Sequence, residues 1–151
     1  MNQFKLKAFS PDKLFFDGEV ENVIVRTSVG DKGIMANHEP YLAALPAGAV
    51  RIKSEAGWRY AAISGGSVKV AKGGETVILA HSMEWSDEID LTRAQAARES
   101  AETRIKNAKQ SADLSGDGGS GSSGNSVNYE LQLAEMKLLR AVNRINSAGL
   151  K

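Results

Sequence analysis

Apolar and polar residues alternate with a period of two through the first half of the chain. The segments 4–8 (FKLKA) and 50–53 (VRIK) show the pattern clearly. Such alternation is typical of a strand that buries one face and exposes the other. The segment 20–27 is rich in β-branched residues and contains VIV at 23–25, which predicts a strand buried on one or both faces.

Turn-forming residues separate these runs at short intervals. They occur at Pro11-Asp12, in a predicted tight loop at 30–33 (GDKG) and at Gly65-Gly66. The KGG at 72–74 lies between VKV and TVIL, which predicts a hairpin. Many short strands joined by frequent turns favour a β-sandwich or flattened barrel.

The period changes to that of a helix after residue 88. Asp90 or Thr92 can supply the N-cap, because a short polar side chain accepts a hydrogen bond from the first turn. One helix is then predicted with a stripe made almost entirely of alanine: Ala94, Ala97, Ala101, Ile105, Ala108 and Ala112. A second helix is predicted by a stripe of larger residues: Leu131, Ala134, Leu138, Ala141, Val142 and Ile145.

Residues 113–127 are rich in Gly and Ser and separate the two predicted helices. Such a composition cannot pack a core and predicts a flexible linker. We therefore expect two parts, a β-sandwich over 1–87 and a helical hairpin over 88–151 that contains the linker. Because a buried methyl group removes little apolar area, at about 25 cal/mol per Å², the alanine stripe predicts a weakly docked hairpin. Patterning alone favours an ordinary tight hairpin over a two-state switch.

Charge and motifs argue against several function classes. The 19 basic and 18 acidic residues leave a net charge of +1, which argues against nucleic-acid binding. No apolar run approaches the roughly 20 residues of a membrane span, so no insertion into the bilayer is expected. The chain has no cysteine, and His38 and His81 belong to no metal-binding or hydrolase motif. We expect a protein that is no enzyme on its own, with no metal and no required cofactor.

Two charged groups have ordinary structural interpretations. Glu84, Asp90 and Arg93 surround the start of the first predicted helix, where Asp90 can cap the helix and pair with Arg93. Lys137, Arg140 and Arg144 share one face of the second helix, which is most simply a solvated face.

A series of motifs resembles those of bacterial ATP synthase epsilon subunits. They are the N-terminal segment 4–20, the glycine–acid–x–glycine and His-x-Pro sequence over 30–40, PAG at 46–48, ISGG at 63–66, IDLTRA at 89–94 and LRAVNRI at 139–145. Each motif is weakly specific alone, but their order and spacing span the whole chain apart from the linker.

The resemblance implies a ten-stranded sandwich followed by two antiparallel helices. It implies a non-catalytic subunit of the central stalk (rotor) of the proton-translocating F-type ATP synthase. The partners would be the gamma subunit, the c-ring and the alpha/beta catalytic hexamer. The candidate residues for the gamma and c-ring interfaces are Asp31, Gly33, Ile34 and His38. The helices would inhibit ATP hydrolysis by extending into the hexamer, where Lys137, Arg140 and Arg144 would meet the beta subunits.

Some members of this family bind ATP on the folded hairpin. The positions that match their site are Glu84, Ile89, Asp90, Arg93, Ala94, Arg140 and Arg144. Ser100 stands where those relatives carry another arginine, and the long linker is a second departure. ATP is therefore expected only as a regulatory ligand.

Two other functions compete with the rotor subunit. The first is an ATP-sensing regulatory module, and the second is an unrelated β-sandwich adaptor that carries a helical hairpin. The lack of a recognisable transit peptide favours a peripheral protein on the cytoplasmic face of a bacterial cell membrane over a thylakoid protein.

Overall fold

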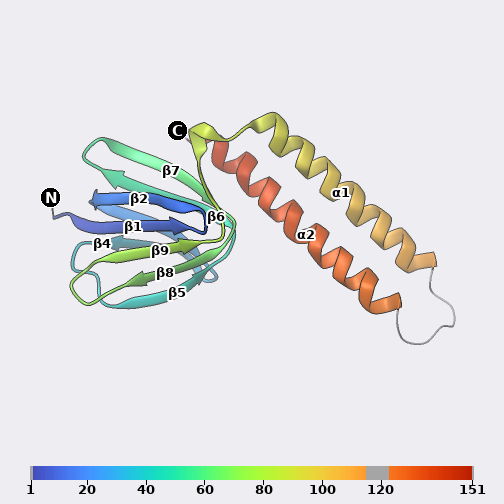
Figure 1. Ribbon diagram of the computed structural model, residues 1–151, viewed down its shortest axis with the longest axis horizontal. Helices are drawn as coiled ribbons and strands as arrows, with labels where there is room; N and C mark the ends of the chain where they lie inside the picture. The colour runs from blue at the N-terminus through green and yellow to red at the C-terminus, as the bar shows by residue number, and fades with distance from the viewer. Residues whose placement is uncertain (1, 115–122, 151) are drawn as a thin grey trace. The chain divides into compact units, whose positions relative to one another are not determined.

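The computed structural model describes residues 2–114 and 123–150, with side chains described up to residue 111 and again from residue 128. Its described residues form two compact units: Met1–Ile89 together with Asn146–Lys151, and Asp90–Ile145. The first unit holds the strands, and the second holds most of both helices (Figure 1).

The first unit is a sandwich of two five-stranded sheets. The first sheet has the order β2-β1-β9-β8-β5, and the second has the order β10-β7-β6-β3-β4. The strands are β1 (Phe4–Ser10), β2 (Lys13–Val20), β3 (Asn22–Thr27), β4 (Gly30–Met35), β5 (Tyr41–Leu45), β6 (Gly48–Ser54), β7 (Gly57–Ile63), β8 (Gly66–Val70), β9 (Thr76–Ala80) and β10 (Met83–Trp85). All neighbouring strands are antiparallel except β1 and β9, which are parallel.

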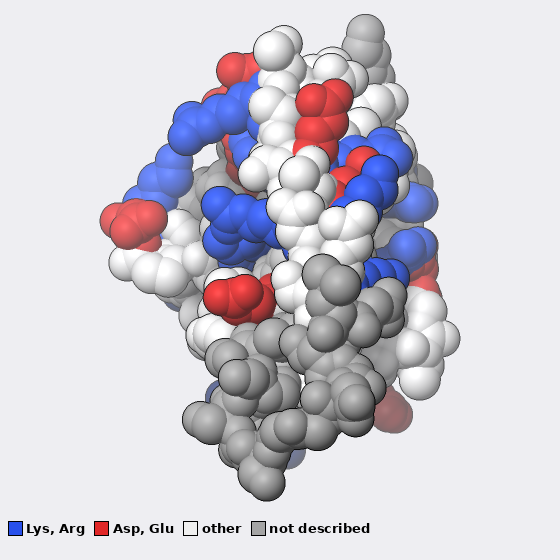
Figure 2. All heavy atoms as spheres, turned by 90° about the vertical axis from the view of Figure 1, so that its right-hand side faces the viewer, with Lys and Arg blue, Asp and Glu red and all other residues white. Residues whose placement is uncertain are grey.

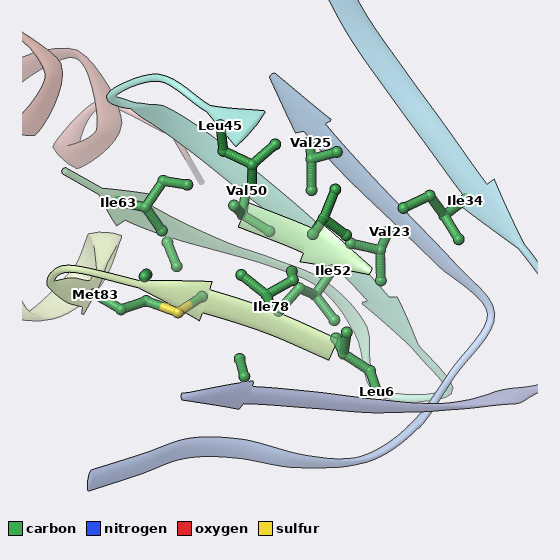
Figure 3. Packing of buried hydrophobic residues seen from close by; sticks show 14 of the residues in the cluster. Leu6, Val23, Val25, Ile34, Leu45, Val50, Ile52, Ile63, Ile78 and Met83 are labelled. Carbon is green, nitrogen blue, oxygen red and sulfur yellow. The ribbon is translucent and has the colours of Figure 1, made fainter. Parts of the chain in front are cut away.

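The core lies between the inner faces of the two sheets (Figure 3). Leu6 and Ile78 from the first sheet meet Ile52 from the second, and each is almost completely buried. The neighbouring residues Lys5 and Lys7 point to the other face of β1, as the period of two predicts. The alternating pattern in the sequence therefore determines which side chains fill the sandwich.

One end of the sandwich is closed by an aromatic cluster around Trp85. A bulge in β2, opposite Ala8 and Phe9, turns Phe15 and Phe16 toward this indole. The Arg59 guanidinium lies 3.7 Å from the centre of the Trp85 ring, a cation–π contact. Beyond Trp85, the short 3-10 helix η1 (Ser86–Glu88) follows, and the Ser86 hydroxyl donates to the carbonyl of Leu150 at 3.3 Å.

The prediction of a tight loop at 30–33 is wrong, because these residues begin β4 and pair with β3. The turn comes two residues earlier, at Ser28-Val29. The Thr27 hydroxyl stabilises it by donating to the Gly30 carbonyl at 2.7 Å and accepting from the Val29 amide at 3.3 Å. Gly30 takes a φ of 125°, a conformation that favours glycine, so a single glycine makes the bend and the remaining residues stay extended.

The second unit is a pair of antiparallel helices, α1 (Leu91–Leu114) and α2 (Ser123–Ala148) (Figure 1). Alanine does form much of the packed stripe: Ala94, Ala101, Ala134 and Ala141 are buried. Ala97 is exposed, whereas Ile105, Leu131, Leu138, Val142 and Ile145 are half-buried. The side chain of Ala112 lies outside the described residues.

Both ends of the predicted linker are helical, since α1 runs through Leu114 and α2 begins at Ser123. Extending a helix costs less than starting one, so the flanking residues can join a helix despite their poor propensity. Residues 115–122 of the predicted linker lie outside the described residues. The predicted fold class, a ten-stranded sandwich followed by a two-helix hairpin, is confirmed.

Gly66 offers a test of how closely β8 approaches β9. A Cβ atom at this position would lie 1.9 Å from the carbonyl oxygen of Leu79, so Gly66→Ala must displace a strand of the first sheet. We expect a loss of at least about 1–3 kcal/mol in the free energy of unfolding, measured by urea denaturation. The control is Gly33→Ala, whose new Cβ would meet nothing closer than 3.9 Å. Equal effects of the two variants would contradict the close approach.

Candidate functional site

The predicted interface residues of β4 lie on two different faces. Asp31 and Gly33 are exposed on the outer face of the second sheet. The Asp31 carboxylate accepts a hydrogen bond from Arg26 at 3.0 Å and lies 3.8 Å from a guanidinium nitrogen of Arg51. Ile34, in contrast, is completely buried, so its side chain serves the core and does not reach the surface.

His38 lies in the segment between β4 and β5, apart from Asp31. Its Nδ1 is 2.7 Å from the Glu39 carbonyl oxygen, and its ring packs edge-on against Tyr41 with centroids 6.0 Å apart. The preceding residue Asn37 has a φ of 62°, in the left-handed region, which fixes the bend before β5. The imidazole is thus half-buried and in contact with Tyr41.

The seven predicted ATP-binding residues are divided between the two units. Glu84, in β10, and Ile89 belong to the first unit, whereas Asp90, Arg93, Ala94, Arg140 and Arg144 belong to the second. The Asp90 carboxylate accepts a hydrogen bond from the Arg93 amide at 3.1 Å, so it caps α1 as one of the two predicted candidates. Ile89 and Ala94 are buried, and Arg93 is exposed.

The basic residues of α2 differ in how far their side chains are exposed to solvent. Lys137 and Arg140 are exposed, and Arg144 is half-buried. On the face of the molecule that Figure 2 shows, basic side chains lie among acidic ones.

The outer face of the first sheet carries an apolar band that the sequence analysis missed. The strand register places one row of outward-facing residues across all five strands: Ala44, Ser67, Leu79, Phe9 and Leu14. The adjacent row is mixed: Leu42 on β5 and Val77 on β9 are apolar, but Lys69 on β8 lies between them and Lys7 on β1 lies beside Val77. We call Phe9, Leu14, Leu42, Ala44, Val77 and Leu79 the outer band.

The outer band exposes large apolar side chains to solvent. Leu42 is 73% exposed, Leu79 is 53% exposed and Leu14 is 49% exposed. Exposed large apolar side chains gathered on one face of a sheet, here interrupted by Ser67 and Lys69, often mark a site of contact with a partner. The sequence did contain a signal, because VIL at 77–79 is apolar at consecutive positions, so one strand presents apolar residues on both faces.

An ion pair borders the outer band. Lys7 donates to the Glu75 carboxylate at 2.8 Å. This hydrogen bond, together with the attraction between the charges, raises the pKa of Lys7 and lowers the pKa of Glu75. Both groups thus stay charged at neutral pH and give the band a polar edge.

The described residues contain no group of three or more His, Cys, Asp or Glu side chains arranged to hold a metal ion. Within the same residues, neither helix has the length and apolar character needed to cross a membrane.

Residues 3–86 match the family profile described as "ATP synthase, Delta/Epsilon chain, beta-sandwich domain". The ATP synthase epsilon chain of Ruminococcus albus is 38% identical over 151 residues, which is 100% of both chains. That of Halalkalibacterium halodurans is 35% identical over 149 residues, 99% of each chain.

A solved structure has a similar fold. It is a chain in the cryo-EM structure of the Euglena gracilis mitochondrial ATP synthase that contains OSCP, F1 and the c-ring. The TM-score is 0.66 at 23% sequence identity, over 93% of this chain and 81% of that one. At this identity the likeness concerns the fold alone.

Proposed function

The chain belongs to the family of ATP synthase epsilon chains, and we propose that it works as a non-catalytic subunit of the rotor of that complex. The observation that carries the proposal is the 38% identity to an epsilon chain over all 151 residues, which include both the sandwich and the hairpin. Such a match is not expected of an unrelated adaptor. In this role the sandwich transmits rotation between the c-ring and the gamma subunit.

The outer band supports a specific site for gamma. It is broad and lies on a sheet whose strands are fixed by the shared core, so it can transmit force without deforming. Covering it removes apolar area from water, worth about 25 cal/mol per Å². The turn between β3 and β4 suits an end-on contact instead, because Val29 at its tip is 93% exposed. We assign the outer band to gamma and this tip, with Asp31 and Gly33 behind it, to the c-ring.

If the outer band binds gamma, one charge placed within it should strongly weaken the binding of gamma. Leu79→Lys at its centre should weaken the complex with gamma about tenfold, because the apolar contact is lost and an ammonium group is desolvated. Titration calorimetry with purified gamma measures this. Val29→Lys is the matched control, since it adds the same charge to an exposed apolar residue outside the band. Unchanged affinity of Leu79→Lys would exclude the band as the gamma site.

We assign the hairpin an inhibitory role. Its seam is largely alanine, so separation of α1 and α2 costs less buried area than separation of leucine-packed helices. Lys137 and Arg140 are exposed and available to an acidic surface of the hexamer. Arg144 is half-buried and contributes next to them.

Charge reversal tests inhibition directly. Lys137→Glu together with Arg140→Glu should raise ATP hydrolysis by the reconstituted complex about fivefold, because about 1 kcal/mol of ion pairing with the hexamer is lost. The difference should shrink as salt is added. Lys106→Glu together with Lys109→Glu, on α1, is the control at equal charge. The same rise in both double variants would show that net charge alone controls hydrolysis.

We further propose that ATP regulates the hairpin through Arg93, Arg140 and Arg144. Arginine suits phosphate because its planar guanidinium donates two parallel hydrogen bonds. Ser100 is exposed on α1, so an arginine fits there.

Restoring an arginine at Ser100 should strengthen ATP binding. We expect Ser100→Arg to tighten ATP binding about tenfold, as one added charge-assisted contact allows. Chemical shifts in an NMR titration report the affinity, with Gln95→Arg as the control that adds the same charge elsewhere on α1. An ATP titration that leaves Arg93, Arg140 and Arg144 unshifted would remove the proposed regulation.

As an epsilon chain, the protein is a peripheral component of a membrane-bound complex. We place it on the cytoplasmic face of a bacterial cell membrane, a proposal that fractionation of the source cells with and without detergent would test.

A further inference from the structure

A pocket of about 400 Å³ lies between the two helices of the second unit. Ala108 of α1 and Ala134 of α2 both line it. Ala134 is buried where the helices pack, and the space lies beside this contact, where the exposed residues Arg104, Asn107, Leu133 and Lys137 line it. The volume falls within the range of small-molecule pockets, about 300–1,000 Å³.

The charges along the pocket are unevenly distributed. Because the helices run antiparallel (Figure 1), Arg104 of α1 and Lys137 of α2 fall at the same end, and Ser111 and Glu130 fall at the other. Among the residues whose side chains are described, the ion pair of the hairpin joins Arg98 to Glu102, and neither Arg104 nor Lys137 takes part in one. Within the described side chains, this end of the pocket therefore presents two cations for which no ion pair is found.

The donors at this end suit a phosphate group. The Arg104 guanidinium can donate to two oxygens, and Lys137 adds a mobile point charge. Asn107, one turn along α1, adds an amide donor. At the far end the Glu130 carboxylate repels a second anion but accepts hydrogen bonds from hydroxyl groups. The chemistry fits a molecule with one phosphate end and a neutral, hydroxylated body.

We propose that this pocket binds a small phosphate monoester, with its phosphate between Arg104 and Lys137 and its hydroxyl groups toward Glu130, while the Ser111 hydroxyl is engaged in donating to the Asn107 carbonyl at 2.9 Å. These residues are separate from Arg93, Arg140 and Arg144, and the proposal does not depend on the role of the chain in the rotor. Arg104 and Lys137 are exposed, so solvent screens their charge and the binding is weak, in the millimolar range.

The test is an NMR titration of the full chain with inorganic phosphate and with glycerol 3-phosphate, at an ionic strength kept constant with chloride. We expect shifts confined to residues 104–108 and 130–137, with glycerol 3-phosphate binding more tightly than inorganic phosphate. Succinate, titrated in parallel, distinguishes a phosphate site from a general carboxylate site. The absence of localised shifts with either phosphate overturns the proposal.

Three variants decide whether the pocket itself binds. Arg104→Gln and Lys137→Gln should each weaken binding about tenfold, as loss of a charge-assisted contact predicts. Lys106→Gln, which removes the same charge from an exposed position outside the pocket, should leave the affinity unchanged. Equal losses of affinity in all three variants would show that net charge alone controls binding and would overturn the proposal.

A fourth variant guards against misfolding. Ala108→Leu fills the pocket without altering any charge, and leucine is a good helix former. With helix content verified by circular dichroism, this variant should lose binding of glycerol 3-phosphate. Unchanged affinity would place the ligand elsewhere and overturn the proposal.

Discussion

The sandwich depends on the interlocking of two apolar sheet faces. Strands β1, β6 and β9 contribute every second residue to this interface, so Leu6, Ile52 and Ile78 are buried while their neighbours along the strand are not. Since the side-chain period of a strand is two, a shift of one residue in register would expose all of them at once. This constraint fixes the register of every strand and hence the positions of all outward-facing residues. The core thereby sets the positions of the outer band and of Asp31 with its partners Arg26 and Arg51.

The two units make different use of apolar surface. The sandwich concentrates large aliphatic side chains in its interior and leaves a second apolar layer, the outer band, in water. The hairpin buries mainly alanine, which gives close contact between helices but little area. A stable body that keeps a contact surface available is therefore joined to a pair of helices with modest mutual packing.

Much of the fold could be predicted from the sequence, because the period changes from two to that of a helix close to Asp90, where α1 is capped. The strand that begins at Gly30 could not be predicted, because the two glycines at 30 and 33 suggested a loop. In the structure Gly30 alone makes the bend, and the residues after it pair with β3. Surface exposure was also beyond reach: Ile34 follows the predicted interface residue Gly33 but points into the core. The outer band requires the pairing of five strands, which brings Phe9 and Leu79 together from distant parts of the chain. The consecutive apolar residues at 77–79 indicate an apolar outer face on β9, but they do not give its neighbours in the sheet.

The discontinuity of the first unit has a consequence for any motion of the helices. Residues 146–151 belong to the same compact unit as the strands, where Leu150 accepts the hydrogen bond of Ser86 and Ser147 is 1% exposed. The chain thus leaves the first unit before α1 and returns to it near the end of α2, so the hairpin is connected to that unit at both ends. Any separation of the end of α2 from the strands would therefore have to break the Ser86–Leu150 hydrogen bond and expose Ser147.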